Sequence, residues 1–380
     1  MRATPTSGSV TSVSFKNLSE HIALGGSLCV YGAGSAGSDL IELVQSLGLP
    51  VAFVLDAKSR STEMRGVPVH APTDLRFESK LRSRTWILIG IFNPAVDVSL
   101  LRQDLLTQGW GLVSSFLDVH AGFHSELGNR YWLTRRDFYD DFSTEISRAR
   151  ALLKDDKSRA IFEGTLRLRT LGDDSGLREP DFFHQYFPKD LLPLQQRLSS
   201  TTLRLVDCGA CVGDTVKHIR KEQYPVDALY LFEPDPKNYQ NLVAELRNGP
   251  LPPNGAQVFP CGVSSRFETL RFSSSKGAAS AFAQSGDIQV TCVSLDDTLA
   301  GCRPNFIKMD VEGAELAALR GGRRLIETNR PILAISAYHQ PKDLWEIAHL
   351  IEGWDLGYDF YLRQHMFTGF DLVLYGIPRK

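Results

Sequence analysis

The sequence has 380 residues, of which 43% are hydrophobic and 23% are charged, and its formal net charge is −2. This balance is ordinary for a globular protein and offers no electrostatic basis for binding nucleic acid or a membrane surface. No apolar run approaches the roughly 18–20 residues that a transmembrane helix needs. The charge and the short apolar runs therefore predict neither a nucleic-acid nor a membrane partner. Because one hydrophobic core rarely extends over so long a chain, we expect two domains.

The N-terminal stretch, residues 1–20, is rich in serine and threonine and has no apolar segment of the kind found in secretory signals. We expect it to be disordered. The six cysteines are too few and too scattered for a disulfide scaffold. This usage indicates a reducing environment and predicts a cytoplasmic protein.

Residues 21–125 alternate between short apolar runs and amphipathic stretches. The first run, at 27–31, is followed by a glycine-rich turn and then by a helical pattern that ends near Gly48. Further strands are predicted at 51–56, 85–92 and 111–119, and a helix at 96–110. Strands that alternate with helices form parallel sheets with right-handed crossovers, so we expect a Rossmann-like domain.

A connector is predicted at 126–200. It begins with charged, helically periodic sequence and continues with an aromatic segment, DFFHQYF, followed by prolines. A flexible linker would not carry so many aromatic side chains. We therefore expect a helical connector.

Strand–helix alternation resumes in residues 201–380. Strands are predicted at 203–210, 228–234, 256–264, 305–313, 331–338, 359–365 and 371–377. The last two lie too close in sequence for a crossover helix and must pair antiparallel. A parallel sheet that ends in such a hairpin is typical of class I S-adenosylmethionine-dependent methyltransferases. The expected fold class is α/β, with two Rossmann-like doubly wound parallel sheets joined by the connector.

The turn after the first of these strands, residues 207–214, reads DCGACVGD. Gly209 and Gly213 permit a sharp turn into a helix and let a ligand approach the backbone. Glu233 ends the next strand, where an acidic residue in a doubly wound sheet hydrogen-bonds ribose hydroxyls. The alternative is zinc or redox chemistry at the two cysteines, but the other cysteines form no second CxxC pair. The pattern favours a nucleotide-type cofactor.

Four segments resemble the FkbM-type family of S-adenosylmethionine-dependent methyltransferases: VDCGACVGDTV, LFEPDPKNYQNL, VSLDDTL and FIKMDVEGAELAALRGG. The segments AISAYHQPKDLWEIAHLI and HQYFPKDLL are similar to parts of longer family members. The resemblance covers residues 203–380 and, more weakly, the connector. It implies S-adenosyl-L-methionine as the cofactor and methyl transfer to a hydroxyl group of a sugar or natural product.

The same resemblance implies a set of cofactor contacts. The glycine turn would flank the amino-acid portion of the cofactor, and Glu233 would hold the ribose. The residues after Glu233, and those after the third strand, would contact the adenine. The expected cofactor-binding residues are Asp207, Gly209, Ala210, Gly213, Asp214, Glu233, Pro234, Asp235, Gly262 and Val263.

A second polar group follows the fourth and fifth strands. Lys308, Asp310 and Glu312 alternate along a predicted strand and so point the same way, and three charges on a buried face are costly without partners. His339 follows the next strand, and an ordinary pKa near 6.5 suits a general base. We therefore expect these four residues to be catalytic, with the base among Asp310, Glu312 and His339.

Two alternatives remain open for this group. In the first, Lys308 and Asp310 form a structural ion pair and Glu312 caps the following helix. In the second, Asp310, Glu312 and His339 hold a divalent metal, although such an ion needs a fuller shell of oxygen ligands. Glu315 is expected in the first turn of that helix, outside the catalytic group.

The other glycine loop contains Gly32, Gly34 and Gly37 in the pattern G-x-G-x-x-G, and Asp56 ends the next strand. This pattern fits a nicotinamide cofactor. With RGVPVHAPTDL, however, the segment resembles the nucleotide-sugar-binding N-terminal domains of bacterial sugar acyltransferases. That resemblance implies a nucleotide-sugar ligand. A third interpretation gives these glycines only a packing role.

The leading hypothesis is an S-adenosylmethionine-dependent O-methyltransferase that acts on a saccharide or natural-product acceptor. The alternatives are an NAD(P)-dependent oxidoreductase that uses the N-terminal loop, and a non-catalytic nucleotide-binding protein. Residues such as His184, Tyr186 and Phe187 of the connector are expected to face the acceptor. The sequence leaves a homo-oligomer open.

Overall fold

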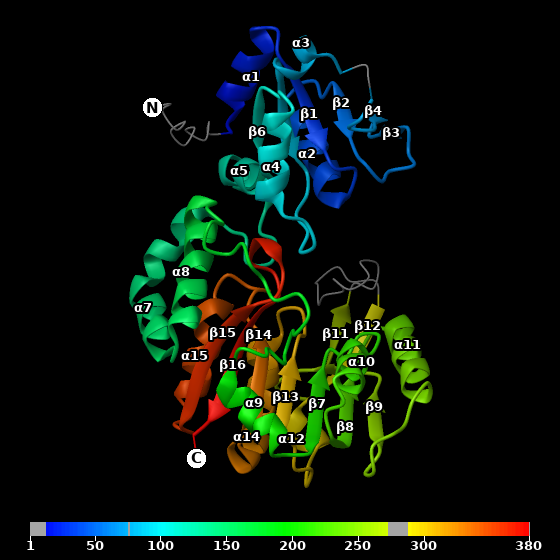
Figure 1. Cartoon of the computed structure of the whole chain (residues 1–380), viewed down its shortest axis with the longest axis vertical. Helices are drawn as coiled ribbons and strands as arrows, with labels where there is room; N and C mark the ends of the chain where they lie inside the picture. The colour runs from blue at the N-terminus through cyan, green and yellow to red at the C-terminus, as the bar shows by residue number, and fades with distance from the viewer. Residues whose placement is uncertain (1–12, 75–76, 273–287, 380) are drawn as a thin grey trace. The chain divides into compact units, whose positions relative to one another are not determined.

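The computed structural model describes residues 13–74, 77–272 and 288–379 (Figure 1). Contacts divide the chain into unit 1, Met1–Asp141 with Gly164–Arg178, and unit 2, Phe142–Glu163 with Glu179–Lys380. The predicted connector is therefore divided between the two units, and the domain bounds expected from the sequence stay predictions.

Unit 1 contains a six-stranded sheet in the order β3-β4-β2-β1-β5-β6, in which every pair is parallel except the edge pair β3–β4. This arrangement confirms the predicted Rossmann-like parallel sheet. The strands are β1 (Ser27–Tyr31), β2 (Phe53–Leu55), β3 (Glu63–Met64), β4 (Val67–His70), β5 (Thr85–Ile89) and β6 (Leu112–Ser114). The helices are α1 (Phe15–Ala23), α2 (Ser35–Ser46), α3 (Ser79–Arg82), α4 (Val98–Thr107), α5 (Phe116–Gly122), α6 (His124–Leu127) and the 3₁₀ helix η1 (Arg136–Phe142).

Two details of unit 1 differ from the sequence prediction. Residues 1–12 of the segment predicted to be disordered lie outside the described residues, but α1 begins at Phe15 because Ser14 caps it and Leu18 is buried. The strand predicted at 111–119 ends at Ser114. Ser115 and Asp118 form a capping box that starts α5, so a local hydrogen-bond motif overrides the apolar run.

Unit 2 contains a seven-stranded sheet in the order β15-β16-β14-β13-β7-β8-β9. The strands are parallel except that β16 runs antiparallel to both β14 and β15, which confirms the predicted terminal hairpin. The sheet strands are β7 (Leu203–Cys208), β8 (Val226–Phe232), β9 (Ala256–Phe259), β13 (Phe306–Met309), β14 (Ile332–Ser336), β15 (Tyr358–Gln364) and β16 (Leu372–Pro378).

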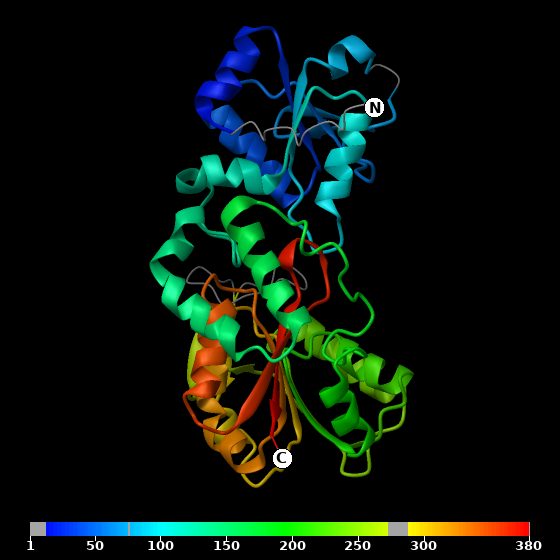
Figure 2. The same ribbon diagram turned by 60° about the vertical axis from the view of Figure 1, so that its left-hand side comes forward.

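Helices cover both faces of this sheet, with α14 and α15 on one face and α10 and α11 on the other (Figure 2). The core on one face includes Phe187, Leu194, Val216, Leu242 and Tyr375. The helices are α7 (Ser143–Leu152), α9 (Leu192–Ser199), α10 (Asp214–Lys221), α11 (Pro236–Arg247), α12 (Leu295–Thr298), α13 (Glu315–Gly321), α14 (Arg323–Asn329), α15 (Asp343–Glu352) and the 3₁₀ helix η3 (Phe367–Gly369). Helix α8 (Asp156–Leu171) is divided between the units: its residues up to Glu163 belong to unit 2, and those from Gly164 onward belong to unit 1.

The strand predicted at 256–264 is interrupted. It ends as β9 at Phe259, and β10 (Gly262–Val263) joins a separate three-stranded sheet with β12 (Ile288–Val293) and β11 (Glu268–Phe272). The interruption follows from Pro260, which has no N–H to donate to a ladder. In the part of the chain that the structure describes, no helix is long and apolar enough to cross a membrane.

The turn after β7 predicts a measurable stability difference between two glycine substitutions. Gly209 has φ +85°, and a Cβ there would lie 1.9 Å from the backbone oxygen of Asp310; Gly255 has φ +80° with open space around it. Gly255→Ala should cost only left-handed strain, about 1–2 kcal/mol. Gly209→Ala should cost about 2 kcal/mol more, because the ends of β7 and β13 must separate. Urea unfolding of both variants measures the difference, and equal losses would contradict this reading.

Candidate functional site

The candidate site begins at the turn between β7 and α10. Three residues in this turn adopt left-handed backbone conformations: Gly209 at φ +85°, Cys211 at φ +48° and Gly213 at φ +84°. The turn places Asp214 at the start of α10, where its exposed carboxylate lies 3.7 Å from Lys217. Gly209 and Gly213 are therefore needed for the chain to turn here, because glycine adopts a positive φ without strain. Cys211 also has a positive φ, and its side chain makes that conformation strained.

Glu233 lies at the end of β8 beside this turn. One carboxylate oxygen accepts the N–H of Cys211 at 2.8 Å, and the other accepts the N–H of Asp235 at 2.8 Å. Burial raises the pKa of Glu233, although both N–H groups favour the carboxylate. Each oxygen keeps a second acceptor direction, so the carboxylate can still receive hydroxyl donors.

The remaining predicted cofactor residues are placed as follows. Pro234 follows Glu233, and the Asp235 carboxylate caps α11 by accepting the N–H groups of Lys237 and Asn238. Ala210, in the turn after β7, is buried. Gly262 and Val263 form β10 in the three-stranded sheet.

Lys308 ties β13 to the turn after β7. Its Nζ atom lies 2.9 Å from Asp207 Oδ1, donates to the Gly209 carbonyl at 2.6 Å and lies over the Tyr186 ring. Burial opposes the charge, but Asp207 and Asp310 outweigh it and raise the pKa of Lys308. The buried ion-pair partner of Lys308 is thus Asp207. In the alternative that the sequence left open, the partner was Asp310.

The strand that carries Lys308 ends earlier than the sequence predicted. β13 stops at Met309, and Glu312 and Gly313 have φ +54° and +98°. Lys308, Asp310 and Glu312 therefore do not alternate along one strand, and that expectation is wrong. The cause is the left-handed pair, which bends the chain before α13.

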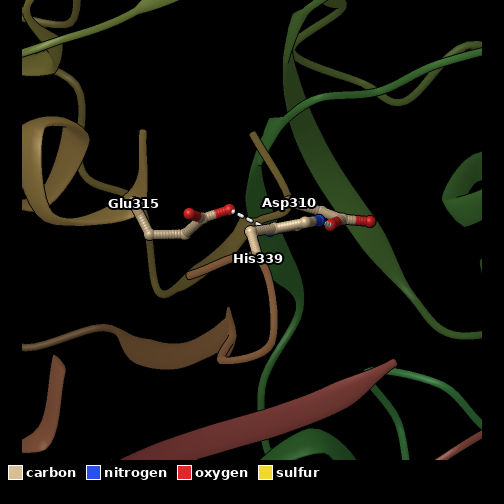
Figure 3. Close-up of side chains that lie close together, drawn as sticks. All are labelled: Asp310, Glu315 and His339. Carbon is tan, nitrogen blue, oxygen red and sulfur yellow. Dashed lines mark hydrogen bonds and ion pairs between the residues drawn. The ribbon is translucent and has the colours of Figure 1, made fainter. Parts of the chain in front are cut away.

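Asp310 and Glu312 still meet His339. His339 Nε2 lies 3.5 Å from Asp310 Oδ1 and 3.5 Å from Glu312 Oε2. Its Nδ1 lies 2.8 Å from Glu315 Oε1, so the imidazole stands between carboxylates (Figure 3). The carboxylate of Asp310 also accepts the Tyr186 hydroxyl at 2.8 Å. The structure thus brings together three of the four predicted catalytic residues and adds Glu315 and Tyr186.

These contacts set the proton affinities. Burial opposes the imidazolium, but Glu315, Glu312 and Asp310 outweigh it and raise the pKa of His339 to about 10. Burial, with help from Asp310 and Glu315, raises the pKa of Glu312 to about 8. Burial would also raise the pKa of Asp310, but Lys308 and His339 lower it below its ordinary value. The ordinary histidine pKa assumed from the sequence is therefore wrong for His339.

Four of the ten described non-glycine residues with positive φ belong to the candidate site. Tyr186, Cys211, Glu312 and Asp371 have φ values of +67°, +48°, +54° and +48°. A non-glycine residue in this region costs about 1–3 kcal/mol and persists only where its surroundings hold it. Asp371 interacts electrostatically with Asp310 and His339, and burial raises its pKa to about 6. Strain of this kind is typical of functional sites.

Asp310, Glu315 and His339 each offer one ligand atom within 4.8 Å of the other two, as a metal site would require. Glu315 Oε1 is hydrogen-bonded to His339 Nδ1 and to the N–H of Val311. Glu315 Oε2 accepts no hydrogen bond from the described residues, so these two contacts do not exclude a metal ligand at Glu315. The metal site considered from the sequence consists of Asp310, Glu312 and His339, with Glu312 in place of Glu315. That set of ligands stays a prediction.

Glu315 and Tyr186 were not predicted as catalytic. The pattern E-G-x-E in the fourth motif places Glu315 only three residues after Glu312, across a glycine, and this short spacing could have indicated a shared site. Tyr186 precedes Asp310 by 124 residues, and no local pattern indicates that contact. Of the other connector residues, His184 pairs with Asp181, and Phe187 is buried between His218, Tyr224 and Phe306.

The glycine loop of unit 1 follows the same plan as the turn after β7. The N–H of Ala33 donates to Asp56 Oδ2 at 2.7 Å, as the N–H of Cys211 does to Glu233. A Cβ on Gly37 would lie 1.9 Å from the Gly32 oxygen, so Gly37 has a packing role. Gly34 has an ordinary φ of −90° and no atom within 4 Å of a Cβ position, so neither backbone nor packing requires a glycine there.

Comparison with known proteins found a family match and a similar structure. Residues 207–360 match the family model of the methyltransferase FkbM domain. The crystal structure of methyltransferase FkbM from Methylobacillus flagellatus KT is similar, with a TM-score of 0.75 and 23% identity over 95% of this chain and 93% of that chain. At this identity the likeness shows the fold alone. No curated protein matches the sequence. The FkbM resemblance recognised from the motifs is thus confirmed at residues 207–360, which match the model of that methyltransferase domain.

Proposed function

We propose that the protein is an S-adenosyl-L-methionine-dependent O-methyltransferase. The observation that carries the proposal is the placement of Glu233 after β8 and of the carboxylate–histidine cluster after β13 and β14, on the two sides of β7. Glu233 ends β8, while Lys308 joins β13 to the turn after β7 and Asp310 follows β13 directly. In a doubly wound sheet, ligands bind outside these carboxyl ends.

The residues fit the proposed cofactor. When bound, S-adenosyl-L-methionine supplies an electrophilic methyl group on a sulfonium. Glu233 would accept the ribose hydroxyls through the free acceptor directions of its carboxylate, and the turn at Gly209–Gly213 would face the amino-acid portion. The Lys308–Asp207 pair would hold that turn in place.

The acceptor hydroxyl needs a group that takes its proton while its oxygen bonds to the methyl carbon. His339 is protonated near neutral pH and cannot take a proton, and the lowered pKa of Asp310 makes its carboxylate a weak base. The pKa of Glu312, raised to about 8, lies closest to neutral pH, where general bases work best. Its side chain is 19% exposed, which leaves it accessible. We therefore propose Glu312 as the base.

A saccharide acceptor suits this cluster better than an apolar one. Asp310 and Glu312 follow β13, and Asp371 directly precedes β16. Sugar hydroxyls can donate hydrogen bonds to all three side chains. An apolar acceptor would leave Asp310 Oδ1 and Glu312 Oε2, which are buried and accept no hydrogen bond from the described residues, without a donor, which is costly. The acceptor class is thus proposed to be a saccharide or a polyhydroxylated natural product.

The ribose contact gives the first functional prediction. Glu233→Gln should weaken binding of S-adenosylhomocysteine by about tenfold or more, because a hydrogen bond to a charged group contributes about 1.5–3 kcal/mol. Glu222→Gln, at a partly exposed acid paired with Lys189, is the control and should bind like the unsubstituted protein. Calorimetry on both variants decides. Unchanged affinity in Glu233→Gln would place the cofactor elsewhere.

The base gives a second prediction. With Glu312 as the base, kcat/KM for the acceptor should rise with pH as this carboxyl ionises, with an apparent pKa of about 8. Glu312→Gln should lower the rate by about 10²-fold or more and remove that dependence. The backbone strain is the same for Glu and Gln, so the turn should persist. Release of S-adenosylhomocysteine with a panel of methyl glycosides measures the rate; a pH profile that survives the substitution would exclude Glu312.

The glycine loop of unit 1 is proposed to bind a nucleotide-sugar rather than NAD(P). The N-terminus of α2, a 12-residue helix, suits a phosphate, and the open space at Gly34 leaves room for a ligand. The carboxylate of Asp56 already accepts three backbone N–H groups, from Ala33, Lys58 and Ser59. Fewer acceptor directions are then left for the ribose diol of a dinucleotide.

Titration of the full chain tests this assignment. UDP-glucose should bind and NAD(P) should not, and Gly34→Leu should abolish UDP-glucose binding while S-adenosylhomocysteine binding stays unchanged. Because neither the φ angle nor the packing at Gly34 requires glycine, the variant should fold normally. Tight NAD(P) binding would favour an oxidoreductase. If neither compound binds, the glycines of this loop have only a packing role.

A further inference from the structure

Glu315 lies at the start of α13 and is the most deeply buried member of the cluster. Its side chain is 0% exposed, whereas those of Asp310 and Glu312 are 24% and 19% exposed. Glu315 therefore cannot touch an acceptor that enters from solvent. Any effect on the reaction must pass through a neighbouring residue.

The neighbour is His339. Glu315 Oε1 accepts the N–H of Val311 at 2.9 Å and lies 2.8 Å from His339 Nδ1. An isolated buried carboxylate is very costly, so the contact with a positively charged imidazole also stabilises Glu315. The hydrogen bond to Val311 fixes the carboxylate on the chain segment that carries Asp310 and Glu312.

The two nitrogens of the His339 ring face different groups. Nδ1 faces Glu315, and Nε2 faces Asp310 and Glu312, each at 3.5 Å. Among the described residues, three carboxylates contact the ring: Glu315 from α13, and Asp310 and Glu312 from the turn before α13. Asp371, from the segment before β16, also interacts with it electrostatically. These carboxylates favour a proton on both nitrogens.

We propose that Glu315 is a positioning residue for the proposed methyl transfer: it holds His339 as a fixed cation whose Nε2 edge orients Asp310 and Glu312 toward the acceptor. The proposal rests on the proposed function. His339 then keeps its proton through the reaction, and the acceptor proton goes to a carboxylate. The raised pKa of His339 agrees with this arrangement.

The protonation of His339 can be measured without an acceptor. In full-length protein with ¹⁵N-labelled histidine, the ring signals of His339, identified by their loss in His339→Gln, should show imidazolium across neutral pH. Glu315→Gln should lower the titration midpoint by about one pH unit or more, since one unit corresponds to 1.36 kcal/mol of lost interaction. Glu327→Gln, an acid on α14 paired with Arg323, is the matched control and should leave the midpoint unchanged.

Two outcomes overturn the proposal at this stage. One is a neutral His339 ring at neutral pH in the unsubstituted protein, which needs no variant to be observed. The other is an unchanged midpoint in Glu315→Gln. If Glu315→Gln fails to fold, Glu315→Asp replaces it: the shorter side chain keeps the charge but withdraws it from Nδ1, and the midpoint should still fall.

Methyl transfer separates this proposal from the proposed function. Glu315→Gln should lower kcat by about tenfold or more, with S-adenosylhomocysteine affinity within about twofold of the unsubstituted protein, because Glu315 does not contact the cofactor turn. A shifted His339 midpoint with unchanged kcat would overturn the positioning role alone. Failure of the unsubstituted protein to bind S-adenosylhomocysteine would instead contradict the proposed function, whatever the histidine titration shows.

Discussion

The buried ammonium group of Lys308 is the contact on which the candidate site depends. It joins Asp207 at the end of β7, the Gly209 carbonyl in the following turn, and the strand that leads to Asp310. Removing one partner of such a buried pair typically costs about 3–5 kcal/mol, because the other charge is left without compensation. The absent side chain at Gly209 lets the two strand ends approach closely enough for this contact to form. The turn at Gly209–Gly213 and the carboxylate cluster are therefore one structural unit.

The second constraint is charge balance around His339. Three carboxylates face this ring, and their repulsion is relieved if the ring is protonated. Burial, together with the nearby carboxylates of Asp310 and Glu315, raises the pKa of Glu312, whose side chain is still partly exposed. The same residue has a left-handed backbone, with φ +54°, and its Oε2 atom lies 3.5 Å from His339 Nε2.

Much of the fold could be predicted because its signals are local. The glycine turn, the acidic residue after β8 and the close spacing of β15 and β16 all follow from residues near one another in sequence. The site was harder, because period-two alternation assigned Glu312 to a strand that in fact ends at Met309. The contact of Tyr186 with Asp310 depends on tertiary packing that no short pattern encodes. Glu315 was assigned a helix-dipole role because its distant partner, His339, is brought in only by the sheet.

The most direct test of the central claim is a crystal structure of the full chain with S-adenosylhomocysteine. The account predicts that the ribose hydroxyls bind Glu233 and that the sulfur faces Asp310, Glu312 and His339. The glycine turn should contact the amino-acid portion without moving, since Lys308 already holds it. A cofactor bound away from Glu233, or a sulfur directed away from the carboxylate cluster, would contradict the account.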